Sequence, residues 1–166
     1  MKKLILALAL LVGVIAIFAQ NPLAVGQTQF NAGLGFSNWG VPVYLGLDYG
    51  AGRDVSVGGE VSFNSYRESY HDNRYNHSII GISGNVNYHF NRVLNIPSNW
   101  DFYAGLNLGY YVWQSPNDYP GDYKNGIGLG GQIGGRYYFT DTIGFNLQFG
   151  GSSAYSGGKF GLSFKL

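Results

Sequence analysis

The sequence predicts an all-β protein that folds as an eight-stranded antiparallel up-and-down β-barrel and crosses a membrane with its strands. The first observation behind this prediction is a repeated segment of about ten residues in which apolar and polar side chains alternate. The second is the share of charged residues, which is only 11%. A soluble domain usually has roughly 25% charged residues. The third is the polar face of each segment, which consists chiefly of Gly, Asn, Ser and Gln.

Eight such segments follow one another without a linker or a change in composition, and helical periodicity is absent. In RYYFTDTIGFNLQFG, residues 136–150, every odd position from Tyr137 to Phe149 except Asp141 is apolar or aromatic. Residues 140–142 therefore read as a short turn between two strands. The predicted strands are Thr28–Phe36, Val41–Tyr49, Val55–Ser65, Ile79–Phe90, Phe102–Trp113, Ile127–Phe139, Ile143–Phe149 and Lys159–Leu166.

Clusters of turn-forming residues separate these strands and divide into two sets, because an up-and-down barrel places alternate connections at opposite ends. The set on the side of the chain termini contains residues 50–54, 91–100 and 140–142. The other set contains residues 37–40, 66–78, 114–125 and 150–158. The two longest connections belong to the second set, which we expect to lie outside the cell.

The two faces of the strands allow two arrangements. A secreted soluble barrel of the lipocalin or avidin kind has an apolar interior and an exterior rich in Lys, Glu and Thr. Here the polar face is dominated by Gly and Asn, which are poor residues for an exposed sheet but suit a narrow lumen. The inverted arrangement is therefore favoured, with apolar side chains toward lipid and every backbone amide paired by closure of the barrel.

Aromatic residues at the strand ends support the membrane assignment. They form two groups, as two interfacial girdles would. One group is Tyr49, Phe90, Phe102 and Phe139, and the other is Phe36, Phe63, Tyr110 and Phe149.

The chain begins MKKLILALALLVGVIAIFAQ, in which two lysines precede an apolar run that ends at a small residue, Ala19. This order is typical of a secretory signal peptide. We expect residues 1–19 to be the signal peptide and residues 20–166 to form the barrel domain. The alternative, a retained membrane helix, is disfavoured because the run from Leu4 to Phe18 is shorter than the roughly 20 residues that span a bilayer.

The segments RYYFTDTIGFNLQFG, FYAGLNLGYYVW, DVSVGGEVSF and KFGLSFKL together resemble the small eight-stranded outer-membrane β-barrel family of diderm bacteria, the OmpA/OmpX-like group. The resemblance covers nearly all of the mature chain and implies a bacterial outer-membrane location. It also implies the lipid bilayer, lipopolysaccharide and the barrel-insertion machinery as partners. Members usually end in an aromatic residue, whereas this chain ends in Leu166, with Phe164 two positions earlier. The resemblance specifies the architecture well and the activity poorly.

Several classes of function are disfavoured by the composition. The chain has no Cys, which excludes disulfides, and its net charge of +1 provides no basic field for nucleic acid. GLGGQIGG is not followed by a helix and is not a phosphate loop. The stretch at 66–78 holds a group that resembles the parts of a hydrolase or a metal site, but a solvated surface loop is the favoured interpretation. That group is Ser69, His71, Asp72, His77 and Ser78.

We therefore expect no enzymatic activity, no metal and no cofactor. Inside the barrel, we expect a buried charge network of Asp48, Glu60, Arg136 and Lys165, with Glu60 opposite Arg136. Tyrosines on the lumen parity are expected to fill the interior. The expected role is structural or surface-interactive, through Tyr-rich external loops whose ligand is unknown. Three alternatives remain open: a narrow porin, a channel for hydrophobic compounds and, less favoured, a lipid-modifying enzyme.

Overall fold

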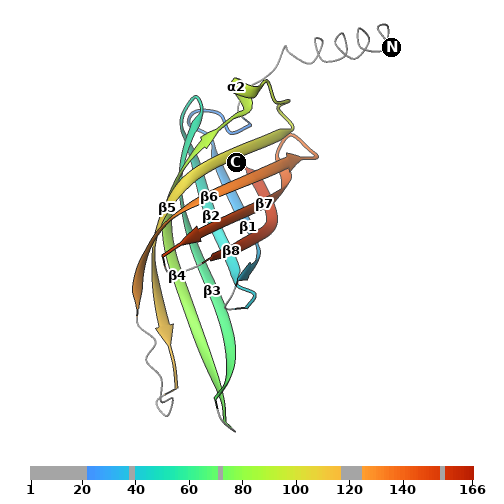
Figure 1. The fold of residues 1–166 in the computed structure, drawn as a ribbon. Helices are drawn as coiled ribbons and strands as arrows, with labels where there is room; N and C mark the ends of the chain where they lie inside the picture. Colours follow the sequence, from blue (N-terminus) through green and yellow to red (C-terminus); the bar gives the residue numbers. More distant parts are fainter. Residues whose placement is uncertain (1–21, 38–39, 71–72, 117–124, 154–155) are drawn as a thin grey trace, which may run out of the picture.

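A computed structural model describes residues 22–37, 40–70, 73–116, 125–153 and 156–166. The predicted signal peptide, residues 1–19, lies outside the described residues. The described part forms a closed barrel of eight strands in sequence order (Figure 1). The strands are β1 (Thr28–Ser37), β2 (Val43–Gly52), β3 (Val55–Tyr70), β4 (Asn73–His89), β5 (Trp100–Gln114), β6 (Gly126–Tyr138), β7 (Ile143–Ser152) and β8 (Ser156–Lys165).

Pairing of the first strand with the last closes the barrel. β1 lies antiparallel to β2 on one side and to β8 on the other, with Phe30 opposite both Leu47 and Phe164. All other pairs join strands that are consecutive in the sequence, and all are antiparallel. This up-and-down order is the predicted topology, and closure gives each strand two hydrogen-bonded neighbours, as hydrocarbon surroundings require.

As predicted, the outer face of the sheet is apolar and the face toward the lumen is mainly polar. Large apolar side chains cover the outer face, and Leu106 and Ile127 are 67% and 68% exposed. The lumen holds polar groups together with three tyrosines that are at most 4% exposed, Tyr44, Tyr103 and Tyr138. Apolar groups exposed to this extent are costly in water, so the exterior suits lipid.

The two ends of the barrel are built differently. Both described chain ends lie at one end, together with the short β2–β3 and β6–β7 turns (Figure 1). At the other end, β2 begins at Val43 opposite Phe63, whereas β3 continues to Tyr70 and pairs with β4 throughout. Residues 64–70 and 73–79 therefore extend beyond the β2 side of the wall, and we call them the projecting hairpin.

The projecting hairpin corrects the loop expected at residues 66–78. The prediction ended β3 at Ser65 and began β4 at Ile79, because the residues between them lack alternating aliphatic side chains. Pairing nevertheless continues from Ser65 and Ser78 to Tyr70 and Asn73. The side chains of Tyr75 and His77 are buried there, so the hairpin keeps the inward and outward alternation of β4 although it lacks aliphatic residues on its outer face.

A second difference lies in the β4–β5 connection, where the sequence indicated no helix. Residues Asn91–Leu94 form a single turn, α2, which ends at Asn95 with φ of 52°. The buried Asn91 amide fixes this turn by donating to the Trp100 carbonyl and accepting from the Phe102 N–H. Among the described residues, no helix is long and apolar enough to span a bilayer.

Candidate functional site

The lumen is divided along its length into a tightly bonded layer near the chain termini and a more open space near the projecting hairpin. We call the first the charged layer: Ser56, His89, Asp101, Arg136 and Asp48. We call the second the vestibule. Every one of these five side chains is buried in the lumen, at the end where β1 begins and β8 ends.

Arg136 is the centre of the charged layer. Its guanidinium donates to Asp48 at 2.6 Å and to Asp101 at 2.9 Å, so one cation joins β6 to both β2 and β5. The guanidinium carbon also lies 4.4 Å from the centre of the Tyr103 ring. Two carboxylates and an aromatic face are the partners that make a buried guanidinium tolerable.

Asp101 extends the layer to β3 through His89. Its second oxygen lies 2.6 Å from His89 Nδ1, and His89 Nε2 lies 2.9 Å from Ser56 Oγ. The order Ser, His, Asp is that of a hydrolytic triad. All three side chains are 0% exposed, however, so no substrate carbonyl can reach Ser56 Oγ in this conformation. None of these three residues was predicted as a site residue from the sequence.

Amides and hydroxyls connect the charged layer to β1 and β8. Asn31 donates to Asp48 at 3.0 Å, and its carbonyl oxygen accepts from Gln29 and Ser163. Tyr138 in turn donates to Gln29. Almost every buried polar group in this layer therefore has a partner, although no partner for Arg136 Nε is found among the described residues.

A segment that precedes β1 crosses the barrel mouth beside this layer. We call residues 22–27 the strap. Leu23 is 0% exposed, Gly26 N donates to Gly50 O at 2.8 Å, and Gly50 N donates to Gln27 O at 3.0 Å. A Cβ on Gly50 would lie 2.0 Å from Ala24 O, so the close approach of the strap requires glycine there. Pro22 and Ala24 line one pocket together with Tyr138 of β6 and Lys165 of β8.

The β2–β3 turn and α2 are joined outside the strands. Arg92 Nε donates to Asp54 Oδ2 at 2.9 Å, and a second nitrogen of the same guanidinium bonds the same oxygen. These hydrogen bonds hold the pKa of the Asp54 carboxyl below its usual value and raise the pKa of Arg92. The contact ties two connections at the end of the barrel that carries the strap.

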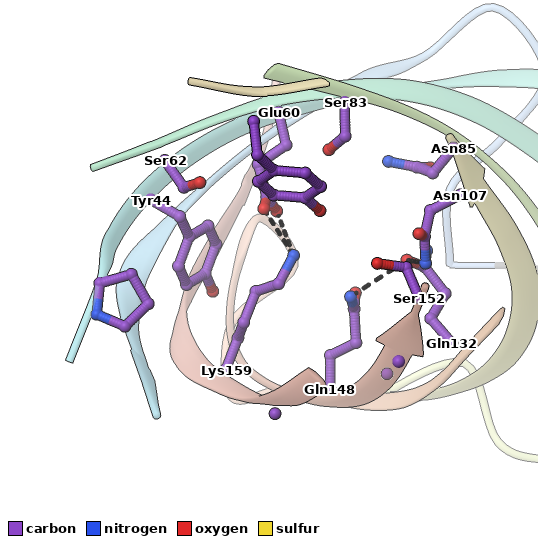
Figure 2. A pocket seen from close by; sticks show the side chains of 15 residues that line it. Tyr44, Glu60, Ser62, Ser83, Asn85, Asn107, Gln132, Gln148, Ser152 and Lys159 are labelled. Carbon is purple, nitrogen blue, oxygen red and sulfur yellow. Dashed lines mark hydrogen bonds and ion pairs between the residues drawn. The ribbon is translucent and has the colours of Figure 1, made fainter. Parts of the chain in front are cut away.

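The vestibule lies on the hairpin side of the charged layer and encloses about 50 Å³ (Figure 2). One water needs roughly 10–15 Å³ by such a measure, and small-molecule pockets usually have about 300–1,000 Å³. The enclosed part thus has room for a few waters. Its wall carries amides, hydroxyls and two tyrosines: Asn85, Asn107, Gln132, Gln148, Ser62, Ser83, Ser152, Tyr44 and Tyr111.

An ion pair crosses the vestibule between β3 and β8. Lys159 Nζ lies 2.5 and 2.7 Å from the two carboxylate oxygens of Glu60, as Figure 2 shows. The ammonium is also 5.4 Å from the centre of the Tyr44 ring. This pairing corrects the expectation that Glu60 would face Arg136, because the two described side chains form no ion pair with each other.

The structure thus separates the four residues of the predicted network. It joins Asp48 to Arg136, gives Glu60 a different cation and places Lys165 at the mouth, with its Nζ 3.8 Å from the centre of the Tyr138 ring. The physical reason is the slant of the strands. Alternation shows that a side chain faces the lumen. Its position along the barrel axis depends on the stagger between strands, which the sequence pattern does not reveal.

The hydrolase-like group predicted at residues 66–78 is not assembled by the described side chains. The side chains of Ser69, His71 and Asp72 lie outside the described residues. His77 is buried, and its Nδ1 lies 2.9 Å from Ser115 Oγ on the β5 side. Within the described part of the chain, no three His, Cys, Asp or Glu side chains gather as metal ligands would.

Comparisons with known proteins identify the fold. No protein-family model matches the chain, and no curated protein matches it. The backbone is similar to OprG from Pseudomonas aeruginosa, with a TM-score of 0.69, 10% identity and coverage of 90% of this chain and 99% of that chain. It is also similar to the N-terminal β-barrel domain of OprF from the same organism, with a TM-score of 0.59, 13% identity and coverage of 86% and 98%.

A third similar structure is Ail, the attachment invasion locus protein of Yersinia pestis, with a TM-score of 0.52, 13% identity and coverage of 86% of this chain and all of that one (100%). At such identities the likeness shows the fold alone. It confirms the predicted eight-stranded transmembrane β-barrel of the small outer-membrane type.

The pairing inside the vestibule yields a test by double-mutant cycle. Glu60→Ala should lower the free energy of unfolding by about 1–3 kcal/mol, because it leaves the Lys159 ammonium without its carboxylate. Adding Lys159→Ala should recover part of this loss, whereas adding Arg136→Ala should give a loss near the sum of the two single changes. Urea unfolding in lipid vesicles measures the unmodified protein, the three single variants and the two double variants. Recovery with Arg136→Ala instead of Lys159→Ala would contradict the observed pairing.

Proposed function

We propose that this chain is a bacterial outer-membrane protein, exported by the predicted signal peptide, that acts at the cell surface through its projecting end and does not conduct solutes. The transmembrane fold and its outer-membrane neighbours support the location. The bilayer, lipopolysaccharide and the barrel-insertion machinery are then its expected partners.

The charged layer is the observation that carries the proposal of a closed lumen. Arg136 bonds two carboxylates across the lumen, and its side chain is only 2% exposed. Opening a path there requires the separation of charges that little water reaches, which is expensive. The strap, with the buried Leu23, adds a second obstruction on the same side. Both features favour a closed barrel over a narrow porin.

The projecting hairpin supports a role at the surface. With the termini in the periplasm, residues 64–79 would extend away from the outer leaflet. The hairpin carries the half-buried Tyr66 and the exposed Arg67, and tyrosine and arginine are frequent contact residues in protein interfaces. One structural neighbour is named for attachment and invasion, and another structure of it is a complex with the heparin analogue sucrose octasulfate. This complex motivates a saccharide probe for this chain.

A second candidate function follows from the contact of His89 with both Ser56 and Asp101. This order of side chains favours a serine hydrolase at the barrel mouth. We place it behind the surface role because burial denies the serine a substrate.

Conductance across planar bilayers tests the closed lumen. The refolded protein should be silent. A variant that lacks residues 22–25 and carries Asp48→Ala, Asp101→Ala and Arg136→Ala should conduct. It removes most of the strap and the Arg136 cation together with both of its carboxylate partners, so none of these three charges is left unpaired. The matched control, Glu60→Ala with Lys159→Ala, changes only the vestibule and should stay silent. Steady conductance by the unmodified protein would overturn the proposal of a closed lumen.

Shortening the projecting hairpin tests the surface role. Replacing residues 66–77 by Asn-Gly joins the paired Ser65 and Ser78 through a two-residue turn. The variant should still fold, as judged by its heat-dependent migration in electrophoresis, because the removed residues lie beyond the β2 wall. Cells that display the unmodified protein should attach to a heparin-coated surface, and cells with the shortened variant should not. Equal attachment by both would contradict a surface role for the hairpin.

A fluorophosphonate probe separates the hydrolase candidate from the surface role. The folded protein should remain unlabelled, because Ser56 is inaccessible. Ser56→Ala and His89→Ala serve as the matched controls and should also remain unlabelled. Labelling that both substitutions abolish would favour the hydrolase.

A further inference from the structure

The outer wall of the barrel contains an apolar groove over β5, β6, β7 and β8, strands that lie side by side in Figure 1. Its volume is about 480 Å³. Its walls include the aromatic and aliphatic side chains Trp100, Phe102, Ile133, Tyr137, Phe145 and Phe160. The groove is distinct from the vestibule, which lies inside the lumen.

Two consecutive glycines of β6 line the floor of the groove. Gly134 faces the lumen, where a Cβ would lie 2.3 Å from the Tyr103 ring. Gly135 faces outward, where a Cβ would lie 3.1 Å from the Phe102 ring. On the outer face, Gly135 thus leaves a gap between Ile133 and Tyr137, and its cross-strand partners Phe102 and Leu147 form the two sides.

Ring contacts hold the walls of this groove in place. Trp100 packs against Tyr137 with ring centres 4.7 Å apart and stacks on Phe102 at 5.6 Å. On the opposite side, Phe145 stacks on Phe160 at 6.1 Å. Because the rings support one another, the groove exists without an occupant to order it.

The position of the groove determines what can fill it. It starts at Trp100 and Tyr137, near the terminus end of the strands, and runs toward Phe149 and Phe160 farther along the wall. Indole and phenol groups favour the interface between headgroups and hydrocarbon, so the groove extends from that interface into the hydrocarbon. Its lining is almost entirely apolar and offers water few hydrogen-bond partners. At this depth the available molecule is a lipid chain.

We propose that the groove binds one acyl chain of a phospholipid from the leaflet on the terminus side. The chain lies over Gly135 between the Phe102 and Phe145 sides and stays with the protein when bulk lipid is removed. The proposal depends on the transmembrane fold and is independent of the surface role.

Native mass spectrometry tests the site. The protein is refolded into vesicles of a single phosphatidylcholine, extracted in mild detergent and weighed. The unmodified barrel should retain one phospholipid. Gly135→Leu fills the floor of the groove and should reduce the retained fraction at least several-fold. The matched control is Gly84→Leu on the outer face of β4, where an added Cβ meets only Gly58 O at 3.7 Å, and it should retain the lipid.

A second variant guards against misfolding of Gly135→Leu. Phe102→Ala with Phe145→Ala removes both sides of the groove and should also lose the lipid. In every variant, heat-dependent migration in electrophoresis reports whether the barrel is folded. The proposal is overturned if folded Gly135→Leu, or the folded double variant, retains phospholipid as the unmodified protein does. It is also overturned if the unmodified protein appears without lipid or as a lipid-free dimer, which would assign the groove to a second copy.

Discussion

Closure of the sheet is the constraint on which the other features of this protein depend. A bilayer offers no partner to an unpaired backbone amide, so β1 must pair with β8 and no sheet edge is left within the membrane. Eight strands then enclose a lumen just wide enough for side chains. The lumen must be filled without clashes and with every polar group satisfied, which explains both the many glycines and the dense hydrogen bonding around Arg136.

The same narrowness gives the two halves of the lumen different properties. Near the termini, Arg136 brings β2, β5 and β6 together through two carboxylates, and His89 adds β3. Near the hairpin, glycines such as Gly150 and Gly157 line the wall and leave space around the Glu60–Lys159 pair. Among the described residues, the vestibule is crossed by the Glu60–Lys159 pair but holds no layer like the one around Arg136.

The sequence pattern predicted the number of strands, their order, both faces and most strand ends, because these follow from a period of two and from local turn residues. It did not predict the partner of Glu60, since alternation reports the face of a residue and not its height. The alternation in Lys159–Leu166 places Lys159 on the polar face, but this pattern does not show that Glu60 is its partner. Leu23 gave no signal, because its burial in the strap depends on the glycine at position 50 and not on a periodic pattern.

The projecting hairpin has a mechanical consequence. If its tip is held while the barrel remains in the membrane, the pull runs along β3 and β4. Hydrogen bonds between antiparallel strands lie perpendicular to the strand direction. The ladders that join β3 to β2 and β4 to β5 would therefore be loaded in shear, with all of their bonds sharing the force at once instead of opening one after another. Extending two strands of the wall, instead of adding a separate loop, makes the barrel itself the anchor that resists traction.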